Sequence, residues 1–78
     1  MSTMKIKIQN NEDKRVLNKS FQPVRGPGIP KGTLVIIEKN STGVYDVDYT
    51  TPYGAYGQFV AEADDLIKLQ SVSRKLKN

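Results

Sequence analysis

Two pairs of carboxylates are the residues of this 78-residue chain whose spacing could serve metal binding or acid–base chemistry. Asp46 and Asp48 are two residues apart in a predicted strand and share one face of it, whereas Asp64 and Asp65 are adjacent. A solvated strand face explains the first pair, and hydrogen bonds to free N–H groups at a helix start explain the second. The chain has no histidine and no cysteine. We therefore expect no catalytic residue, metal site, cofactor or small-molecule substrate.

Two glycine-rich segments, residues 25–28 and 53–57, have the composition of phosphate-binding loops. The first lacks the lysine and hydroxyl residue that follow in a P-loop, and the second leads into a predicted strand, where a phosphate site needs a helix. Turn formation explains both segments. Each carries a side chain suited to contact with a protein partner, namely Arg25 in the first and Tyr53 and Tyr56 in the second.

The four tyrosines fall into two groups. Tyr53 and Tyr56 lie among prolines and glycines, where a large ring is less needed for a core, and they are predicted to anchor a partner. An alternative stays open, in which one or both rings fold back over an end of the domain. Tyr45 and Tyr49 alternate with aspartates in a strand pattern, so they are assigned to its buried face.

The formal charge of +4 is distributed unevenly along the chain. Residues 1–31 carry +5, residues 32–67 carry −5 and residues 68–78 carry +4. The alternative function is nucleic-acid binding through Lys5, Lys7, Lys14, Arg15 and Arg25, together with the basic C-terminal residues. The acidic middle part disfavours it because it repels a polyanion, and lysines on an edge strand also serve to prevent aggregation.

The elements that must position these residues are mainly strands. Alternation predicts a strand at Met4–Gln9, and residues 12–17 fit equally a short helical turn or a loop or hairpin in which Val16 and Leu17 cover the core. Proline and glycine predict a long loop up to residue 32. The remaining predicted elements are strands Thr33–Glu38, Val44–Tyr49 and Gln58–Ala61, a single helical turn from Asp64, a closing strand Leu66–Leu69 and a basic flexible tail over residues 71–78.

This order of elements resembles the Src-homology-three-like small barrels, in which five strands curl together and a one-turn 3₁₀ helix precedes the fifth. The resemblance is carried by residues 31–37, 44–49 and 59–69. It implies an all-β fold: a single five-stranded SH3-like barrel over residues 1–70, with a long loop at 10–32 after the first strand. The chain has no tryptophan, so it departs from the members that bind proline-rich peptides.

We expect a non-enzymatic protein-binding module, acting as an accessory, adaptor or inhibitor protein that docks its loops on a larger partner. The longest apolar run, residues 34–37, is far shorter than the roughly 20 residues that span a bilayer, so no membrane contact is expected. The N-terminus has no secretory pattern, which indicates a cytoplasmic location. Small lysine-rich domains of this kind are associated with phages and mobile elements.

Overall fold

The computed structural model describes residues 12–40 and 42–76 of the chain. No helix in these residues is long and apolar enough to cross a membrane. The strands at residues 34–39, 45–50 and 56–61 confirm three of the strands predicted from the sequence, with bounds that differ by one or two residues. The elements are β1 (Glu12–Leu17), β2 (Leu34–Lys39), β3 (Tyr45–Thr50), β4 (Tyr56–Ala61), α1 (Ala63–Ser71) and β5 (Ser73–Lys75).

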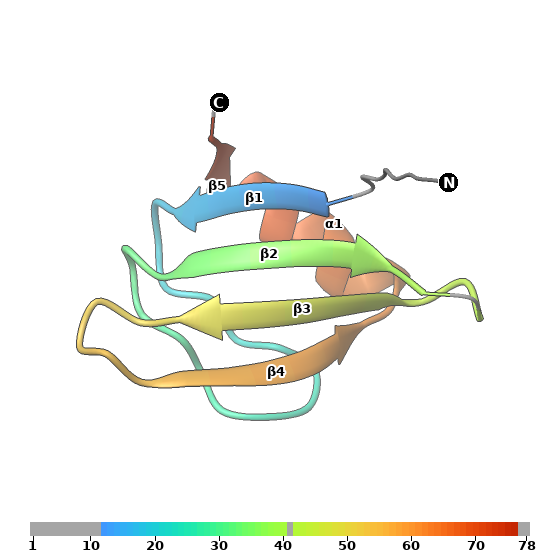
Figure 1. Cartoon of the computed structure of the whole chain (residues 1–78), viewed down its shortest axis with the longest axis horizontal. Coiled ribbons are helices and arrows are strands. Elements are labelled where there is room, and N and C mark those ends of the chain that lie inside the picture. Colours follow the sequence, from blue (N-terminus) through green and yellow to red (C-terminus); the bar gives the residue numbers. More distant parts are fainter. Residues whose placement is uncertain (1–11, 41, 77–78) are drawn as a thin grey trace, which may run out of the picture.

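The five strands form one antiparallel sheet in the order β4-β3-β2-β1-β5 (Figure 1). The all-β class predicted from the sequence is confirmed. Strands β4 and β5 are the two ends of this order, and no ladder joins them within the described residues, so closure into a barrel is not shown. The helix α1 connects these two edge strands and contacts both of them.

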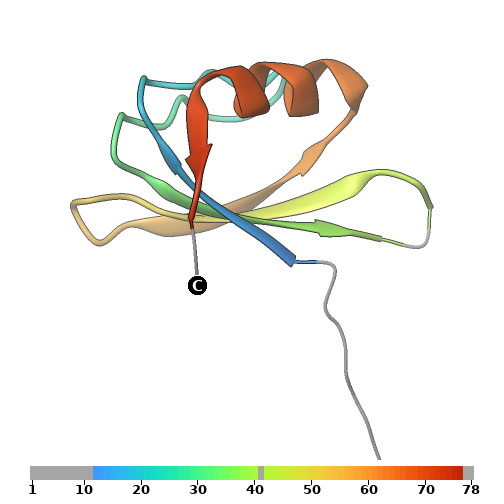
Figure 2. The same ribbon diagram turned by 90° about the horizontal axis from the view of Figure 1, so that it is seen from above.

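The hydrophobic core lies between one face of the sheet and a second layer, which consists of α1 and the loop of residues 18–33 (Figure 2). Alternation along the strands directs Val35, Ile37 and Val47 to this inner face, and all three are buried. Leu69 of α1 packs into the same cluster and is fully buried. The outer face of the sheet is not covered by any other described element (Figure 2).

The loop of residues 18–33 is held together by backbone hydrogen bonds. At its base, the Leu17 N–H donates to the Thr33 carbonyl oxygen at 3.0 Å. Further along, Phe21 and Ile29 exchange two backbone hydrogen bonds of 2.8 Å, and both side chains are buried in the core. At the tip, the Gln22 side-chain amide donates to the Gly26 carbonyl oxygen at 3.0 Å. The proline- and glycine-rich segment is therefore an ordered loop that covers the core.

Residues 12–17 form β1, so the helical turn predicted as one alternative for this segment is wrong. The strand pairs with β2 on one side and with β5 on the other. In β1 the acidic residues precede the basic ones, and this order suits a strand. The Arg15 guanidinium lies 3.0 Å from the carboxylate of Asp13, which is two residues away on the same face. The long loop therefore begins at residue 18, not at residue 10. The strand predicted at Met4–Gln9 lies outside the described residues.

The C-terminal part also differs from the prediction. The apolar run Leu66–Leu69, predicted as the closing strand, belongs to α1, which has nine residues where a single 3₁₀ turn was expected. A short apolar run does not distinguish a strand from a helix, and helical spacing here sends Leu66 and Leu69 to the core while Ile67 stays exposed. The closing strand is β5, which lies within the segment predicted as a flexible tail and pairs with β1.

Candidate protein-binding surface

The β3–β4 hairpin exposes two tyrosine rings. Its turn is closed by the Thr51 N–H, which donates to the Ala55 carbonyl oxygen at 2.7 Å, and it includes Gly54 at a φ of 90°. Tyr53 in this turn is 86% exposed, and Tyr56 at the start of β4 is 82% exposed. Neither ring folds back over an end of the domain, so both are free to contact another molecule.

The other two tyrosines lie on the inner face, as predicted. Tyr45 and Tyr49 are half-buried and pack against the core. Tyr49 lies directly opposite Gly57 on β4, and a Cβ atom at Gly57 would approach the Tyr49 hydroxyl oxygen to 2.6 Å. The missing side chain at residue 57 therefore makes room for the Tyr49 ring.

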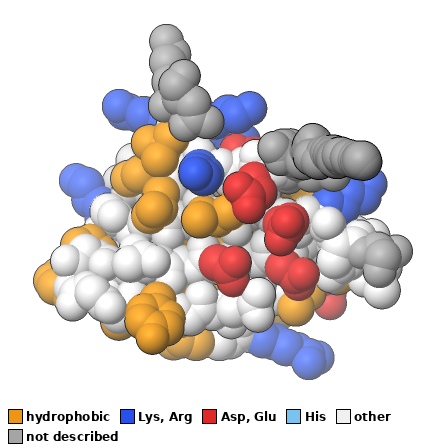
Figure 3. Space-filling view, in the orientation of Figure 1, with side chains coloured by type: hydrophobic (Ala, Val, Ile, Leu, Met, Phe, Trp, Pro, Cys, Tyr) orange, Lys and Arg blue, Asp and Glu red, His pale blue; other side chains and the backbone are white. Residues whose placement is uncertain are grey.

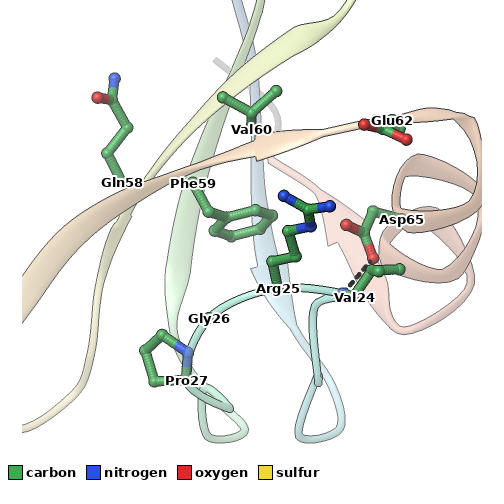
Figure 4. Close-up of a pocket in the computed structure, with 9 residues that line it drawn as sticks. All are labelled: Val24, Arg25, Gly26, Pro27, Gln58, Phe59, Val60, Glu62 and Asp65. Carbon is green, nitrogen blue, oxygen red and sulfur yellow. Dashed lines mark hydrogen bonds between the residues drawn. The ribbon is translucent and has the colours of Figure 1, made fainter.

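A groove of about 470 Å³ lies between the loop of residues 18–33 and β4 (Figure 4). This volume lies within the range of about 300–1,000 Å³ that is usual for ligand pockets. The side chains of Arg25 and Phe59 point toward one another in the groove, whereas Gln58 and Val60 point to the opposite side of β4 (Figure 4). We call it the β4 groove, and its lining residues are Val24, Arg25, Gly26, Pro27, Gln58, Phe59, Val60, Glu62 and Asp65.

The aromatic wall of the β4 groove is fixed by its neighbours. The Phe59 ring stacks on Phe21, with 5.9 Å between the ring centroids, and lies tilted against Tyr49 at 6.1 Å. Aromatic pairs at such separations stabilise their arrangement beyond the area that they bury. Phe59 is half-buried, so part of a rigid apolar ring remains available to a ligand.

Asp65 holds the other wall of the β4 groove in place. Its carboxylate, only 3% exposed, accepts a hydrogen bond of 2.9 Å from the Val24 N–H, which lies 41 residues away in the sequence. This corrects the helix-capping role predicted for Asp64 and Asp65, because the N-cap of α1 is Glu62 and no side chain caps it. Both aspartates do lie in the first helical turn, where the helix dipole favours negative charge.

The residues predicted to bind a partner lie at different points along β4 and do not form one cluster. Arg25 is exposed and lies beside residues 58–60, and it has no ion pair within the described residues. Tyr56 begins the same strand, about 7 Å before Gln58 at the usual rise per residue. Tyr53 lies further away, in the turn that precedes the strand. We call Tyr53, Tyr56 and the β4 groove together the β4 surface.

The basic residues predicted for nucleic-acid binding are scattered. Arg15 is engaged by Asp13 and its side chain is only 15% exposed. Lys14 lies on the outer face opposite Ile36, and Arg25 lies in the β4 groove on the other side of the sheet. Lys5 and Lys7 lie outside the described residues. Lys14, Arg15 and Arg25 thus do not share one surface. Of the basic C-terminal residues, Lys75 lies opposite Arg15, and Arg74 lies opposite Val16 on the face that carries Lys14.

The outer face of the sheet carries carboxylates in a row. Cross-strand register places Glu12 opposite Glu38, and Glu38 opposite Asp46, while Asp48 lies on the same face of β3. Asp and Glu side chains gather on this face in Figure 3. Within residues 12–40 and 42–76, no group of three or more His, Cys, Asp or Glu is placed to hold a metal ion. We call these four carboxylates the acidic face.

Sequence reasoning missed most of the β4 groove. The sequence assigned Gln58, Phe59 and Val60 to a strand. It did not indicate that this strand lies at the edge of the sheet, because only the strand order in the structure shows this. Val24 and Pro27 come from the loop, and no local pattern indicates that this loop packs beside β4. A strand without charged residues between two polar segments was the one available signal.

Comparison of the chain with known protein families, with curated proteins and with solved structures finds no match. The β4 surface combines the two exposed tyrosines with the β4 groove.

Proposed function

We propose that this chain is a non-enzymatic protein-binding module that docks a partner protein on the β4 surface. The observation that carries the proposal is the exposure of Tyr53 and Tyr56, at 86% and 82%, along one edge of the sheet: Tyr56 lies on the outer face of β4, and a groove with an aromatic wall lies on the inner side of the same strand. Tyrosine combines a large contact area with a hydrogen-bonding tip, and it is enriched among the residues that dominate binding energy. The sequence has no histidine or cysteine, which supports binding over catalysis.

The proposal extends to the fold, which we infer to be an SH3-like barrel. Five strands, a long loop between the first and second strands and a helix before the fifth support this assignment. Two features depart from the expected pattern: α1 is longer than one turn, and the described strands belong to one sheet. In such a fold, loops and strand edges form the surface that is free to recognise another molecule.

Nucleic-acid binding, the alternative from the sequence, has less support. Contacts to phosphates need several lysines and arginines on one face. Here Arg15 is paired with Asp13, Lys14 shares the outer face with four carboxylates, and Arg25 is separated from both.

Alanine at both Tyr53 and Tyr56 tests the proposal. Because both rings are exposed, the double variant should keep the melting temperature of the parent protein. Removal of two anchoring rings should reduce partner capture about tenfold or more, since each such residue contributes over about 1 kcal/mol. Capture is measured by pull-down with the tagged protein and quantitative mass spectrometry.

The matched control is Ile67→Ala, which removes an apolar side chain that is 66% exposed on α1 and does not line the β4 groove. Capture by this control should equal that of the parent protein. Undiminished capture by the folded double variant would overturn the proposed binding surface.

A further inference from the structure

The edge strand β4 has backbone N–H and C=O groups that point away from the sheet. The Thr51–Ala55 hydrogen bond fixes which residues of β4 bond to β3. The backbone N–H and C=O groups of residues 57, 59 and 61 point toward β3. The N–H and C=O groups of Tyr56, Gln58 and Val60 therefore point outward. Within the described residues, none of these six groups has a hydrogen-bond partner.

The two edges of the sheet are protected differently. The edge strand β5 has three residues and includes Arg74 and Lys75, and short, charged edges resist pairing with another chain. The edge strand β4 has six residues, with no charged residue and no proline. A long, uncharged edge of this kind is a template on which a further strand can pair.

The β4 groove lies beside this edge on the inner side of the sheet. Side chains of an added strand would alternate between the two faces, as in every strand of the sheet. Those directed inward would enter the groove, between the Phe59 ring and the loop at Val24 and Pro27 (Figure 4). The Phe59 ring, Val24 and Pro27 favour apolar side chains at these alternate positions, beside the Arg25 side chain that points toward Phe59.

The acidic face determines which side chains of an added strand are favoured on the outer side of the sheet. Asp46 lies opposite Val60, and Asp48 lies opposite Gln58, so both flank β4 on its outer face. An added strand would lie two strand spacings, about 10 Å, from β3, which carries these carboxylates; this distance is about one Debye length at 0.1 M salt. Lysine or arginine side chains directed outward would reach across β4 toward Asp46 and Asp48, whereas acidic ones would be repelled.

We propose that the partner contributes an extended segment that pairs antiparallel with β4 as a sixth strand, with alternating apolar and basic residues. The apolar residues occupy the β4 groove, and the basic residues lie on the outer face beside Asp46 and Asp48. A second copy paired through the same edge would place Gln58 opposite Gln58 and bring two acidic faces onto one side of a continuous sheet, so we commit to a basic segment of another protein. This inference rests on the proposed function and specifies the partner.

The probe is a blocked seven-residue peptide of alternating lysine and valine, titrated against the full chain and followed by the backbone amide NMR signals. The largest shifts are expected at Gln58 and Val60. Affinity should fall as salt is added, and a glutamate–valine peptide of the same pattern should bind at least about tenfold more weakly. Equal affinity for the two peptides overturns the basic partner, and shifts confined to other elements overturn the site.

Backbone pairing is tested at Gln58. Gln58→Pro removes an N–H that faces outward, a position where edge strands tolerate proline, and it should weaken peptide binding about tenfold or more. Gln58→Thr, the matched control, also replaces the side chain but keeps the N–H, so it should bind at least about tenfold more tightly than Gln58→Pro. Equal binding by two folded variants overturns strand pairing.

A probe modified on its own backbone avoids dependence on the folding of the proline variant. In antiparallel pairing, the residues whose side chains lie on the outer face are those whose backbone groups bond to the outward groups of β4. N-methylation of the lysine residues should therefore abolish binding, and N-methylation of the valine residues should leave it largely intact. Retained binding by the lysine-methylated peptide overturns the antiparallel register.

The proposed function and this inference fail in different experiments. If Gln58→Pro and Gln58→Thr capture the partner equally while Tyr53→Ala/Tyr56→Ala does not, strand pairing is wrong and the protein-binding role stands. Concentration-dependent dimers of the parent protein that disappear in Gln58→Pro would assign the edge to a second copy and overturn the proposed segment.

Discussion

Gly57 shows how one residue determines the shape of the inner face. The hydroxyl oxygen and Cζ of Tyr49 would lie 2.6 and 2.8 Å from a Cβ at this position, closer than carbon side chains tolerate. The Tyr49 ring in turn contacts Phe59, which forms the wall of the β4 groove. The absence of a side chain at residue 57 is thus required for the packing that supports the β4 surface.

Gly57→Ala should therefore destabilise the protein by about 1–3 kcal/mol, the usual effect of forcing extra volume into a packed site. The measurement is the free energy of unfolding from urea denaturation. Tyr49→Val removes the ring that clashes, so Gly57→Ala should have a much smaller effect in the Tyr49→Val background. Additive effects of the two substitutions would show that the contact does not control this position.

Asp65 illustrates a residue whose role the sequence could not reveal. Two adjacent aspartates before an apolar run favour helix capping, and they do lie in the first turn of α1. The Asp65 carboxylate instead accepts a hydrogen bond from the Val24 N–H within one wall of the β4 groove. Such a contact joins residues 41 positions apart, so only the tertiary fold brings the two groups together.

At the scale of elements, local pattern predicted the strands whose partners are adjacent in the sequence. Thr33–Glu38 and Val44–Tyr49 are β-branched or alternating, and their hairpin turns contain glycine, so propensity and pairing agree. The prediction failed at residues 12–17 and 66–69, where short runs fit more than one structure. Pairing with β2 and β5 decides the first, and packing on the core decides the second.

The helix at residues 63–71 can be verified by its exposure pattern. A strand would put Ile67 and Leu69 on the same face, whereas the helix exposes Ile67 at 66% and buries Leu69 completely. Leu69→Ala should cost about 2–5 kcal/mol of stability, and Ile67→Ala less than about 0.5 kcal/mol. Chemical denaturation measures both. Similar losses for the two variants would contradict the helical assignment.

The acidic face has an energetic consequence for the sheet. Glu38 lies between Glu12 and Asp46 in the cross-strand register, and like charges directly opposite one another are destabilising. Glu38→Gln should raise the free energy of unfolding by about 0.2–1 kcal/mol at low salt, and by less at high salt. Glu62→Gln, the control outside this row, should not raise the free energy of unfolding, because negative charge at the N-terminus of α1 is favoured by the helix dipole. A loss of stability on Glu38→Gln would contradict the repulsion.

At the scale of the whole molecule, charge and exposed aromatic side chains are segregated. The chain carries a formal charge of +4, yet the outer face of the sheet gathers four carboxylates. The sequence predicted an acidic middle part, but the cross-strand register was needed to place these charges in one row. Exposed tyrosines and the groove lie along the opposite edge from β5, so one edge of the sheet is suited to contact and the other is protected.

The central claim, that a partner docks along β4, is tested most directly by site-specific photocrosslinking in living cells. A benzophenone amino acid replaces Tyr56 of β4 in one variant and Ile67 of α1 in another, and both positions are exposed. The account predicts a discrete crosslinked protein product from position 56 that is absent from position 67. A product from position 67 alone, or equal products from both positions, would contradict it.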